Sequence, residues 1–332
     1  MRTLSALRTE LAAIGCTAEV IGPDRFLTVP APTYPSIRLA VLPGRHLGGI
    51  MASFRPDALH IATEGPLGLA ARRWAIRRGA AFTTSFHTRF AEYLHARARI
   101  PLSLSYGWLR RFHAAGKGTL VAAASLREEL SARGFAHLRP WTRGVDLNLF
   151  RLGTREDWAY PRPVFLYVGR VAVEKNLPAF LGLDLPGSKV VVGDGPQRPA
   201  LQRAYPGAHF VGVRGGAALA RAYAGADVLV FPSRTDTFGL VLLESLACGT
   251  PVAAYPVTGP LDVLAGAEEV GAVDVDLRAA CLRALAADSA ACRAHAERFS
   301  WRACADGFLH GAVNVVHGRR VGVGARHAAA RA

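Results

Sequence analysis

Short apolar runs alternate with segments of helical periodicity along the chain. In the first half, the apolar runs cover residues 57–62, 81–85 and 119–124. The first of them is followed by residues 69–79, where hydrophobic residues recur at helical spacing up to Gly79. Strand, turn, helix and strand in this order are typical of a parallel α/β sheet.

A second series of the same kind begins after residue 163. Its runs are continuously apolar, and a glycine or proline follows each within two residues. Parallel strands that are buried on both faces have this pattern, whereas half-exposed strands alternate. We therefore predict a second parallel sheet from residues 164–168, 189–192, 209–213, 227–231 and 252–255.

Between the two series, the mixed and proline-flanked stretch at 140–163 indicates a break between domains. A chain of 332 residues is long enough for two domains. The basic, aperiodic end of the chain is expected to be disordered, either solvated or touching anionic lipid. The predicted organisation is an N-terminal domain (1–145), a linker (146–163), a C-terminal domain (164–300), a helix packing toward the N-terminal domain (301–317) and a basic tail (318–332).

Three helix ends carry local signals. Ser125 with Glu128 suggests a capping box, and Asp276 in the DVD sequence at 274–276 suggests an N-cap. A helix from about Phe238 to Cys248 would end at Gly249, with Pro251 as the stop.

Composition limits the cellular compartments in which the protein is expected. No apolar run reaches the roughly 18–20 residues that a membrane span needs, and the N-terminus lacks the features of a signal peptide. The five cysteines form no CxxC pair, which favours reduced, mostly buried thiols over a zinc site. We expect a cytoplasmic protein, with peripheral contact at the inner face of the membrane as a further option.

The charge is uneven. The formal net charge is +15; residues 1–150 hold 20 basic and 9 acidic side chains (+11), and the remainder hold 20 and 16 (+4). Two interpretations remain open: a face for lipid headgroups or nucleic acid, or arginines spread over a solvated surface. Likewise, the aromatic and basic run at 100–118 fits either a membrane-lying segment or a core helix with a basic face.

Polar and charged residues follow the predicted strands of the second half. Arg170 and Lys175 follow the first strand, and a glycine-rich turn, residues 193–196, follows the second. Asp236 follows the fourth. Because open parallel sheets bind ligands at the carboxyl ends of their strands, cations and backbone amides there suit a diphosphate, and acids suit sugar hydroxyls. Together they predict a site for a sugar nucleotide.

Glu244 lies inside the most apolar predicted helix. Its neighbours at helical spacing are all apolar: Leu240, Val241, Ala247 and Cys248. A carboxylate buried there is costly unless it is hydrogen-bonded. Its partner is therefore either a buried donor of the protein or the hydroxyls of a ligand.

The order of these segments resembles the retaining glycosyltransferases of family 4. The resemblance rests on GR followed by EKN, then GDGP, FVG and YAGADVLVFPS, and on two acids separated by seven residues, Asp236 and Glu244. The family usually has Glu at the first acid. HIATEGPLGLAARR, TTSFHTRFAEYL and TRGVDLNLF are similar to the branch of α-mannosyltransferases and sulfoquinovosyl-diacylglycerol synthase-like enzymes. The implied fold is GT-B: two Rossmann-like domains facing a cleft.

The resemblance also implies roles by position. Arg170 and Lys175 would bind the donor diphosphate, Glu244 the ribose and Asp236 the donor sugar, opposite His87 of the first domain. Catalytic roles fall on His87, Arg170, Lys175 and Asp236. The implied donor-binding set is Gly169, Arg170, Lys175, Gly193, Val213, Asp236, Thr237, Phe238, Gly239, Leu240 and Glu244.

Other polar residues of the first half are assigned differently. We interpret His60 as a core residue, and Glu64 as either a helix-capping acid or part of an acceptor site. A GT-B domain opens with a strand and a glycine-rich turn before its first helix. The resemblance implies that this sequence lacks both. The segment at 1–15 is similar to the first helix, and residues 16–23 are predicted as the second strand.

The implied activity is transfer of a hexose, of the mannose or glucose type, from a GDP- or UDP-linked sugar to an acceptor hydroxyl on a lipid or glycan. No metal, cofactor or nucleic acid is expected. The rivals are a catalytically impaired basic GT-B remnant that binds membrane or nucleic acid, and an enzyme of the same fold that epimerises or hydrolyses sugar nucleotides.

Overall fold

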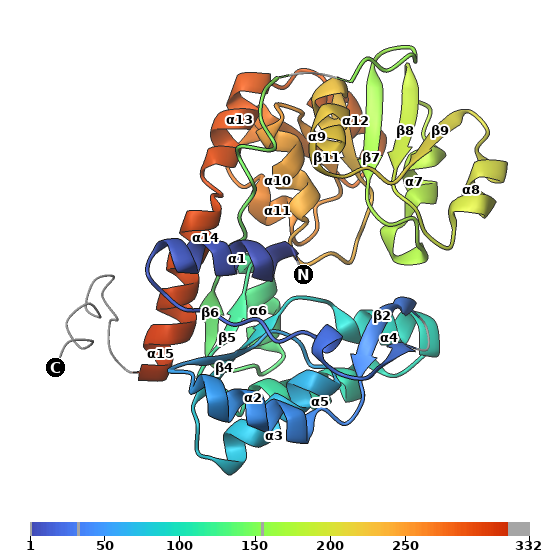
Figure 1. Cartoon of the computed structure of the whole chain (residues 1–332). Helices are drawn as coiled ribbons and strands as arrows, with labels where there is room; N and C mark the ends of the chain where they lie inside the picture. Colours follow the sequence, from blue (N-terminus) through green and yellow to red (C-terminus); the bar gives the residue numbers. More distant parts are fainter. Residues whose placement is uncertain (1, 32–33, 154–155, 318–332) are drawn as a thin grey trace. The chain divides into compact units, whose positions relative to one another are not determined.

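The computed structural model describes residues 2–31, 34–153 and 156–317 (Figure 1). The predicted tail at 318–332 lies outside the described residues. The chain divides into two compact units, which we describe separately: unit 1 is Met1–Thr142 with Arg302–Ala332, and unit 2 is Arg143–Trp301.

The sheet of unit 1 has four parallel strands in the order β3-β4-β5-β6. The predicted runs at 57–62, 81–85 and 119–124 are three of these strands. The fourth, β6, was missed because it contains no apolar run: two of its three residues, Arg139 and Pro140, are exposed. The strands are β3 (Leu59–Ile61), β4 (Phe82–Phe86), β5 (Thr119–Val121) and β6 (Leu138–Pro140).

Helices accompany these strands and bury their apolar stripes against the sheet. For example, Leu126 and Leu130 of α6 pack with Phe86 of β4 in one core cluster. The helices of unit 1 are α1 (Arg2–Ala13), α2 (Gly44–Phe54), α3 (Pro66–Arg77), α4 (Phe90–Ala98), α5 (Leu102–His113), α6 (Ala124–Ala132), α14 (Trp301–Phe308), a π-helical turn (Leu309–Val313) and α15 (Asn314–His317).

Two predictions for unit 1 are wrong. Residues 16–23 form no strand; they lead as a loop into a 3-10 helix (Pro23–Arg25), and a separate antiparallel hairpin, β1 (Thr28–Ala31) and β2 (Tyr34–Ala40), follows. Ser125 does not cap α6, because that helix begins one residue earlier and its N-cap is Ala123, without a side-chain cap. An N-cap side chain must lie outside the helix, and Ser125 is already inside it.

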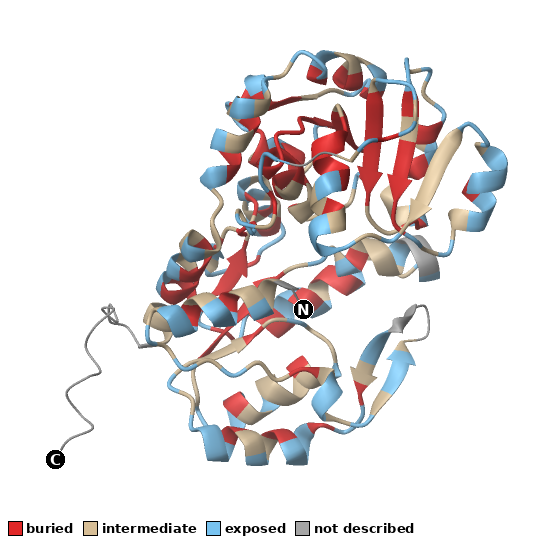
Figure 2. Cartoon of the chain, turned by 45° about the horizontal axis from the view of Figure 1, so that its top comes forward, coloured by how far each residue is buried: buried red, intermediate tan, exposed pale blue. Residues whose placement is uncertain are grey.

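Unit 2 contains a six-stranded parallel sheet in the order β12-β11-β10-β7-β8-β9. The five predicted strands are present, and β12 is an additional three-residue strand. Figure 2 shows the central strands as buried and the edge strand β9 as intermediate, in line with β7, where every residue is buried. The strands are β7 (Val164–Val168), β8 (Ser188–Val192), β9 (Ala208–Gly212), β10 (Val228–Phe231), β11 (Val252–Ala254) and β12 (Gly271–Val273).

The helices of unit 2 cover this sheet. Asp276 caps α12, as predicted: its carboxylate accepts from the Arg278 amide at 2.9 Å. Four of the five cysteines are buried and all five are free thiols. The helices are α7 (Leu177–Leu181), α8 (Arg198–Ala204), α9 (Gly216–Gly225), α10 (Leu240–Ala247), α11 (Pro260–Val263), α12 (Leu277–Ala284) and α13 (Ser289–Glu297), with 3-10 turns at Val173–Lys175 and Glu268–Val270.

The strand order of unit 2 has a topological switch point. From β7 the chain proceeds through β8 to β9 on one side, and then returns to the other side through β10, β11 and β12. The reversal therefore falls between the neighbouring strands β7 and β10. Ligands of open α/β sheets bind at such a reversal, beyond the carboxyl ends of the strands.

Candidate functional site

The loops that follow β7 and β10 meet at this switch point. The Lys175 ammonium donates to Asp236, with 2.5 Å between Nζ and Oδ1. Two contacts hold the loops together: Asn176 Nδ2 donates to the Pro232 carbonyl at 3.2 Å, and Thr235 Oγ1 donates to the Glu174 carbonyl at 3.3 Å. The structure thus brings together a predicted diphosphate-binding cation and a predicted sugar-binding acid.

Only one of the two carboxylate oxygens of Asp236 accepts a hydrogen bond from the described residues. Its side chain is 16% exposed. Oδ1 accepts from Lys175, whereas Oδ2 is buried and has no hydrogen-bond partner among the described residues. A buried carboxylate oxygen without a donor is costly, and a hydroxyl group of a ligand would satisfy it.

Glycines allow the turn after β8 to lie directly on the turn after β7. A Cβ on Gly193, which has φ +143°, would come 1.8 Å from the Gly169 carbonyl oxygen. No side chain fits there. The two glycine turns therefore form one close-packed backbone surface beside Arg170, which is half-buried.

Tyr167, a residue not singled out in the sequence, supports the same turn. Its hydroxyl donates to the Arg170 carbonyl at 2.8 Å, and its side chain is only 2% exposed. Burial, together with the nearby carboxylates of Asp236 and Glu174, raises the pKa of Tyr167 above its ordinary value. The hydroxyl therefore stays protonated and fixes the backbone from which the Arg170 side chain projects.

Glu244 lies on α10, which begins after Gly239 (φ +82°) and ends before Gly249 (φ +78°). The helix starts two residues later than predicted and ends one residue earlier, at Ala247, with Gly249 directly after the C-cap as predicted. Glu244 is half-buried, and the Tyr223 hydroxyl donates to its Oε2 at 2.9 Å. A buried donor of the protein, one of the two partners expected from the sequence, is therefore present.

Tyr223 is itself held rigidly and was also missed in the sequence. It is fully buried, its ring packs edge-on against Phe150 at 5.9 Å, and its carbonyl accepts from Thr250 Oγ1 at 2.6 Å. Its position in α9 gives no signal, because a tyrosine on an apolar helix stripe is an ordinary core residue.

The other predicted donor-binding residues are distributed around these loops. Thr237 and Leu240 are half-buried and Phe238 is buried, on the segment that leads into α10. Gly259 packs on the Phe238 carbonyl, where a Cβ would come within 2.7 Å. Val213 is different: it follows the edge strand β9, is 75% exposed, and is brought to neither acid.

His87 belongs to unit 1, where it comes directly after β4. It is half-buried and its ring centroid lies 5.6 Å from that of Trp141. His60 is a structural residue, as predicted: its two ring nitrogens contact the Thr83 and Ser85 hydroxyls at 2.9 and 2.6 Å.

Glu64 does not cap α3, which corrects one of the two predictions for it. The N-cap is Gly65, without a side-chain cap. Instead, Glu64 Oε1 lies 3.2 Å from His113 Nε2, and His113 Nδ1 lies 2.8 Å from Thr84 Oγ1. His113 is 3% exposed, so this chain of polar contacts runs through the interior. The sequence could not pair residues 49 positions apart.

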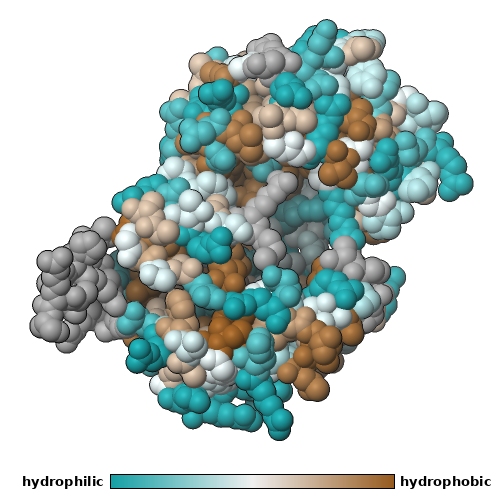
Figure 3. Space-filling view, viewed as in Figure 1, coloured by the Kyte–Doolittle hydropathy of each residue, from teal (hydrophilic) through white to brown (hydrophobic). Residues whose placement is uncertain are grey.

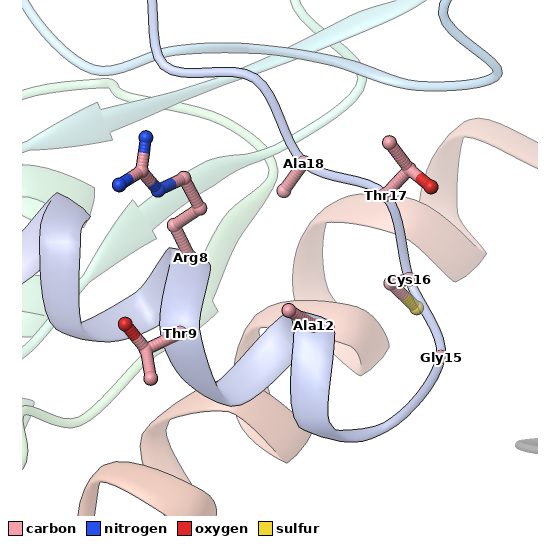
Figure 4. Close-up of a pocket in the computed structure, with 7 residues that line it drawn as sticks. All are labelled: Arg8, Thr9, Ala12, Gly15, Cys16, Thr17 and Ala18. Carbon is pink, nitrogen blue, oxygen red and sulfur yellow. The ribbon is translucent and has the colours of Figure 1, made fainter.

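A hollow of about 590 Å³ lies beside α1 (Figure 4). It contains none of the predicted site residues, so its volume does not mark the polar site of unit 2. It is lined by Arg8, Thr9, Ala12, Gly15, Cys16, Thr17 and Ala18.

Comparison with known protein families gives two matches that together span most of the chain. Residues 5–149 match the model described as Glycosyltransferase Family 4, and residues 162–288 match the model described as Glycosyl transferases group 1.

Among similar proteins, a GDP-mannose-dependent alpha-mannosyltransferase of Mycolicibacterium smegmatis is 33% identical over 75% of this chain and 69% of its own length. The sulfoquinovosyl transferase SQD2 of Arabidopsis thaliana is 30% identical, over 86% and 61%. A GDP-mannose-dependent alpha-(1-6)-phosphatidylinositol dimannoside mannosyltransferase of Mycobacterium tuberculosis is 32% identical, over 68% and 64%. The chain thus spans between 61% and 69% of the length of these relatives.

Solved structures show the fold. Sucrose-phosphate synthase from Thermosynechococcus elongatus superposes with a TM-score of 0.70 at 21% identity, covering 92% of this chain and 91% of that one. The lipopolysaccharide outer core galactosyltransferase WaaB gives 0.59 at 17% identity, covering 82% and 78%. With its two parallel-sheet domains, the chain has the GT-B fold.

Proposed function

Since the chain belongs to glycosyltransferase family 4, we propose that it is a retaining glycosyltransferase that moves a hexose from a nucleotide-diphosphate sugar to an acceptor hydroxyl. The observation that carries the proposal is the meeting of Lys175 and Asp236 at the β7/β10 switch point. A cation that can bind a diphosphate is then adjacent to an acid that can bind a sugar. A sugar nucleotide requires this, because its diphosphate is bonded directly to its sugar.

In this proposal the charged residues bind different parts of the donor. Lys175 and Arg170 bind the diphosphate, because cations stabilise the negative charge that develops on a leaving phosphate. Asp236 accepts from a sugar hydroxyl through its unpartnered Oδ2, and Glu244 accepts from the ribose hydroxyls. The backbone of Thr237, Phe238 and Gly239 lines the sugar and diphosphate, and Val213 lies beside the base. His87 is proposed as a further catalytic residue.

The proposed reaction is a front-face substitution. The bond between the anomeric carbon and the diphosphate oxygen breaks, and its electron pair leaves with the nucleotide diphosphate. The acceptor oxygen bonds to the same face of that carbon, and its proton passes to the departing phosphate oxygen. No metal is needed in this scheme, because Arg170 and Lys175 supply the positive charge.

The names of the relatives support a choice of substrates. Two are GDP-mannose-dependent mannosyltransferases, and one of these acts on a phosphatidylinositol dimannoside. We therefore favour GDP-mannose as donor, with a UDP-linked hexose as the alternative, and a lipid or glycolipid as acceptor.

Titration calorimetry tests the donor assignment. GDP, UDP, GDP-mannose and UDP-glucose are titrated into the wild type and into Lys175→Ala and Glu244→Ala. We expect one nucleotide to bind, and binding to weaken in both variants while both remain folded. Absence of binding by all four ligands would favour the rival, a basic surface-binding remnant. Products formed without an acceptor would favour an epimerase or hydrolase.

A further inference from the structure

A hydrophobic groove opens on the surface of unit 1 between α4 and α5. Its volume is about 320 Å³. Three of its side chains are unusually exposed for their type: Leu104 is 66% exposed, Trp108 41% and Phe90 40%. Figure 3 shows hydrophobic residues grouped on part of the surface of unit 1. The groove residues are Phe90, Leu94, Ile100, Leu104, Ser105 and Trp108.

The charges next to this groove have one sign. The 24 residues from Phe90 to His113 contain four arginines and a single acid, Glu92. That acid faces the interior, where it accepts from the Tyr106 hydroxyl at 2.6 Å and from Arg89 at 3.2 Å. It therefore does not neutralise the outer surface of the two helices.

Apolar and basic side chains follow one another along a single stripe of α5. Leu104, Trp108 and Arg111 are spaced by four and three residues, so they lie on one helix face, and all three are exposed. At the other end of the groove, the exposed Arg99 precedes Ile100. Apolar side chains flanked by arginines, with a tryptophan among them, are the features of a helix that lies in a membrane interface.

We propose that the α4–α5 groove docks unit 1 on an anionic lipid bilayer, with Leu104 and Trp108 entering the acyl region and Arg99 and Arg111 meeting the headgroups. Charge complementarity selects this occupant. An anionic surface attracts the arginines, and the groove removes apolar surface from water. No described helix is long and apolar enough to cross a membrane, so the contact is peripheral. The proposal does not depend on the donor site, which lies in unit 2.

Vesicle co-sedimentation tests it, with vesicles of phosphatidylcholine alone and with about 30% phosphatidylglycerol. The wild type should bind the anionic vesicles, and about 0.5 M salt should weaken binding because it screens the arginines. The double variant Leu104→Asp with Trp108→Asp should bind at least about tenfold more weakly. Arg99→Glu with Arg111→Glu should lose the preference for anionic vesicles.

Val275→Asp is the matched control, since Val275 is an apolar residue of unit 2 that is 80% exposed. It should bind vesicles like the wild type. Nucleotide titration should be unchanged in every variant, which separates this proposal from the transferase assignment. The proposal is overturned if the wild type ignores anionic vesicles, if the double aspartate variant binds as well as the wild type, or if the groove instead mediates a dimer that this variant dissociates in gel filtration.

Discussion

Lys175 Nζ lies 2.5 Å from Asp236 Oδ1, although the two residues are 61 positions apart in the chain. Both side chains are partly shielded, with exposures of 22% and 16%. The pair shows how the fold joins a cation to an acid at one sheet edge. It also predicts that a donor binds both members of the pair: its diphosphate accepts from the ammonium, and a sugar hydroxyl donates to the unpartnered Oδ2 of the carboxylate.

Asp236→Asn should lower kcat/KM by about 10²-fold or more, because the amide is a weaker acceptor and no longer pairs with the ammonium. A partly exposed ion pair contributes little to folding, so Tm should shift by less than about 3 °C. Steady-state kinetics and calorimetry measure both. The exposed Asp157→Asn is the control; equal effects of the two substitutions would contradict the role of Asp236.

Tyr223→Phe should weaken nucleotide binding roughly tenfold, about 1.4 kcal/mol, because Glu244 loses the hydroxyl that orients its carboxylate. We expect KM for the donor to rise while kcat changes by less than about twofold, since Glu244 is proposed to bind a part of the donor remote from the bond that breaks. Tyr205→Phe removes a hydroxyl elsewhere in unit 2 and serves as control. If Tyr223→Phe binds nucleotide like the wild type while Glu244→Gln binds it weakly, Tyr223 does not position that carboxylate.

Gly193→Ala should destabilise unit 2 by at least about 2 kcal/mol, because the new Cβ would come 1.8 Å from the Gly169 carbonyl oxygen and the backbone would have to move. Gly207→Ala is the matched control, since a Cβ there meets no atom within 4 Å. Urea denaturation compares the two. Similar unfolding free energies would show that the two turns are not packed as described.

Glu64→Ala should lower the unfolding free energy by about 1–3 kcal/mol, because it leaves the buried His113 Nε2 without its partner. The exposed Glu128→Ala should be close to neutral. Thermal unfolding and transfer assays are needed together. If Glu64→Ala loses activity at unchanged stability, the acceptor-site interpretation is the better one.

Alkaline pH should weaken the fold through buried thiols. Burial raises the pKa of Cys281 from 9.0 to about 12, and the pKa of Cys248 and of Cys292 to the same value. The unfolded chain then releases protons at a lower pH than the folded one, so the stabilisation is complete below pH 9 and is lost as pH rises toward 12. Chemical denaturation between pH 8 and about 10.5 measures the slope.

Cys281→Ala should make that slope less negative, by at most about 1.4 kcal/mol per pH unit. Cys16→Ala is the control, because Cys16 is not buried. Identical slopes for Cys281→Ala and the wild type would exclude a contribution from this thiol.

The sequence by itself determined the two parallel-sheet series, the end of α10 at Gly249 and the cap at Asp276. These features are encoded locally: continuous apolar runs, glycines in left-handed turns and a side chain that bonds its own backbone. The same reasoning failed where local pattern is ambiguous. Residues 16–23 resemble a strand but form no ladder. The strands β6 (Leu-Arg-Pro) and β12 (Gly-Ala-Val) lack a continuous run of large apolar residues, so they give no pattern.

Only the tertiary structure decided which polar groups are partners. The order of the strands places the loop of Lys175 against that of Asp236, and helix packing places Tyr223 beside Glu244 and His113 beside Glu64. The hydrogen bonds in these pairs depend on atomic positions set by residues 21 to 61 places apart, which no local pattern records. The sequence identified the types of residue that the site needs. Only the fold showed that the buried Tyr167 and Tyr223 donate to Arg170 and Glu244.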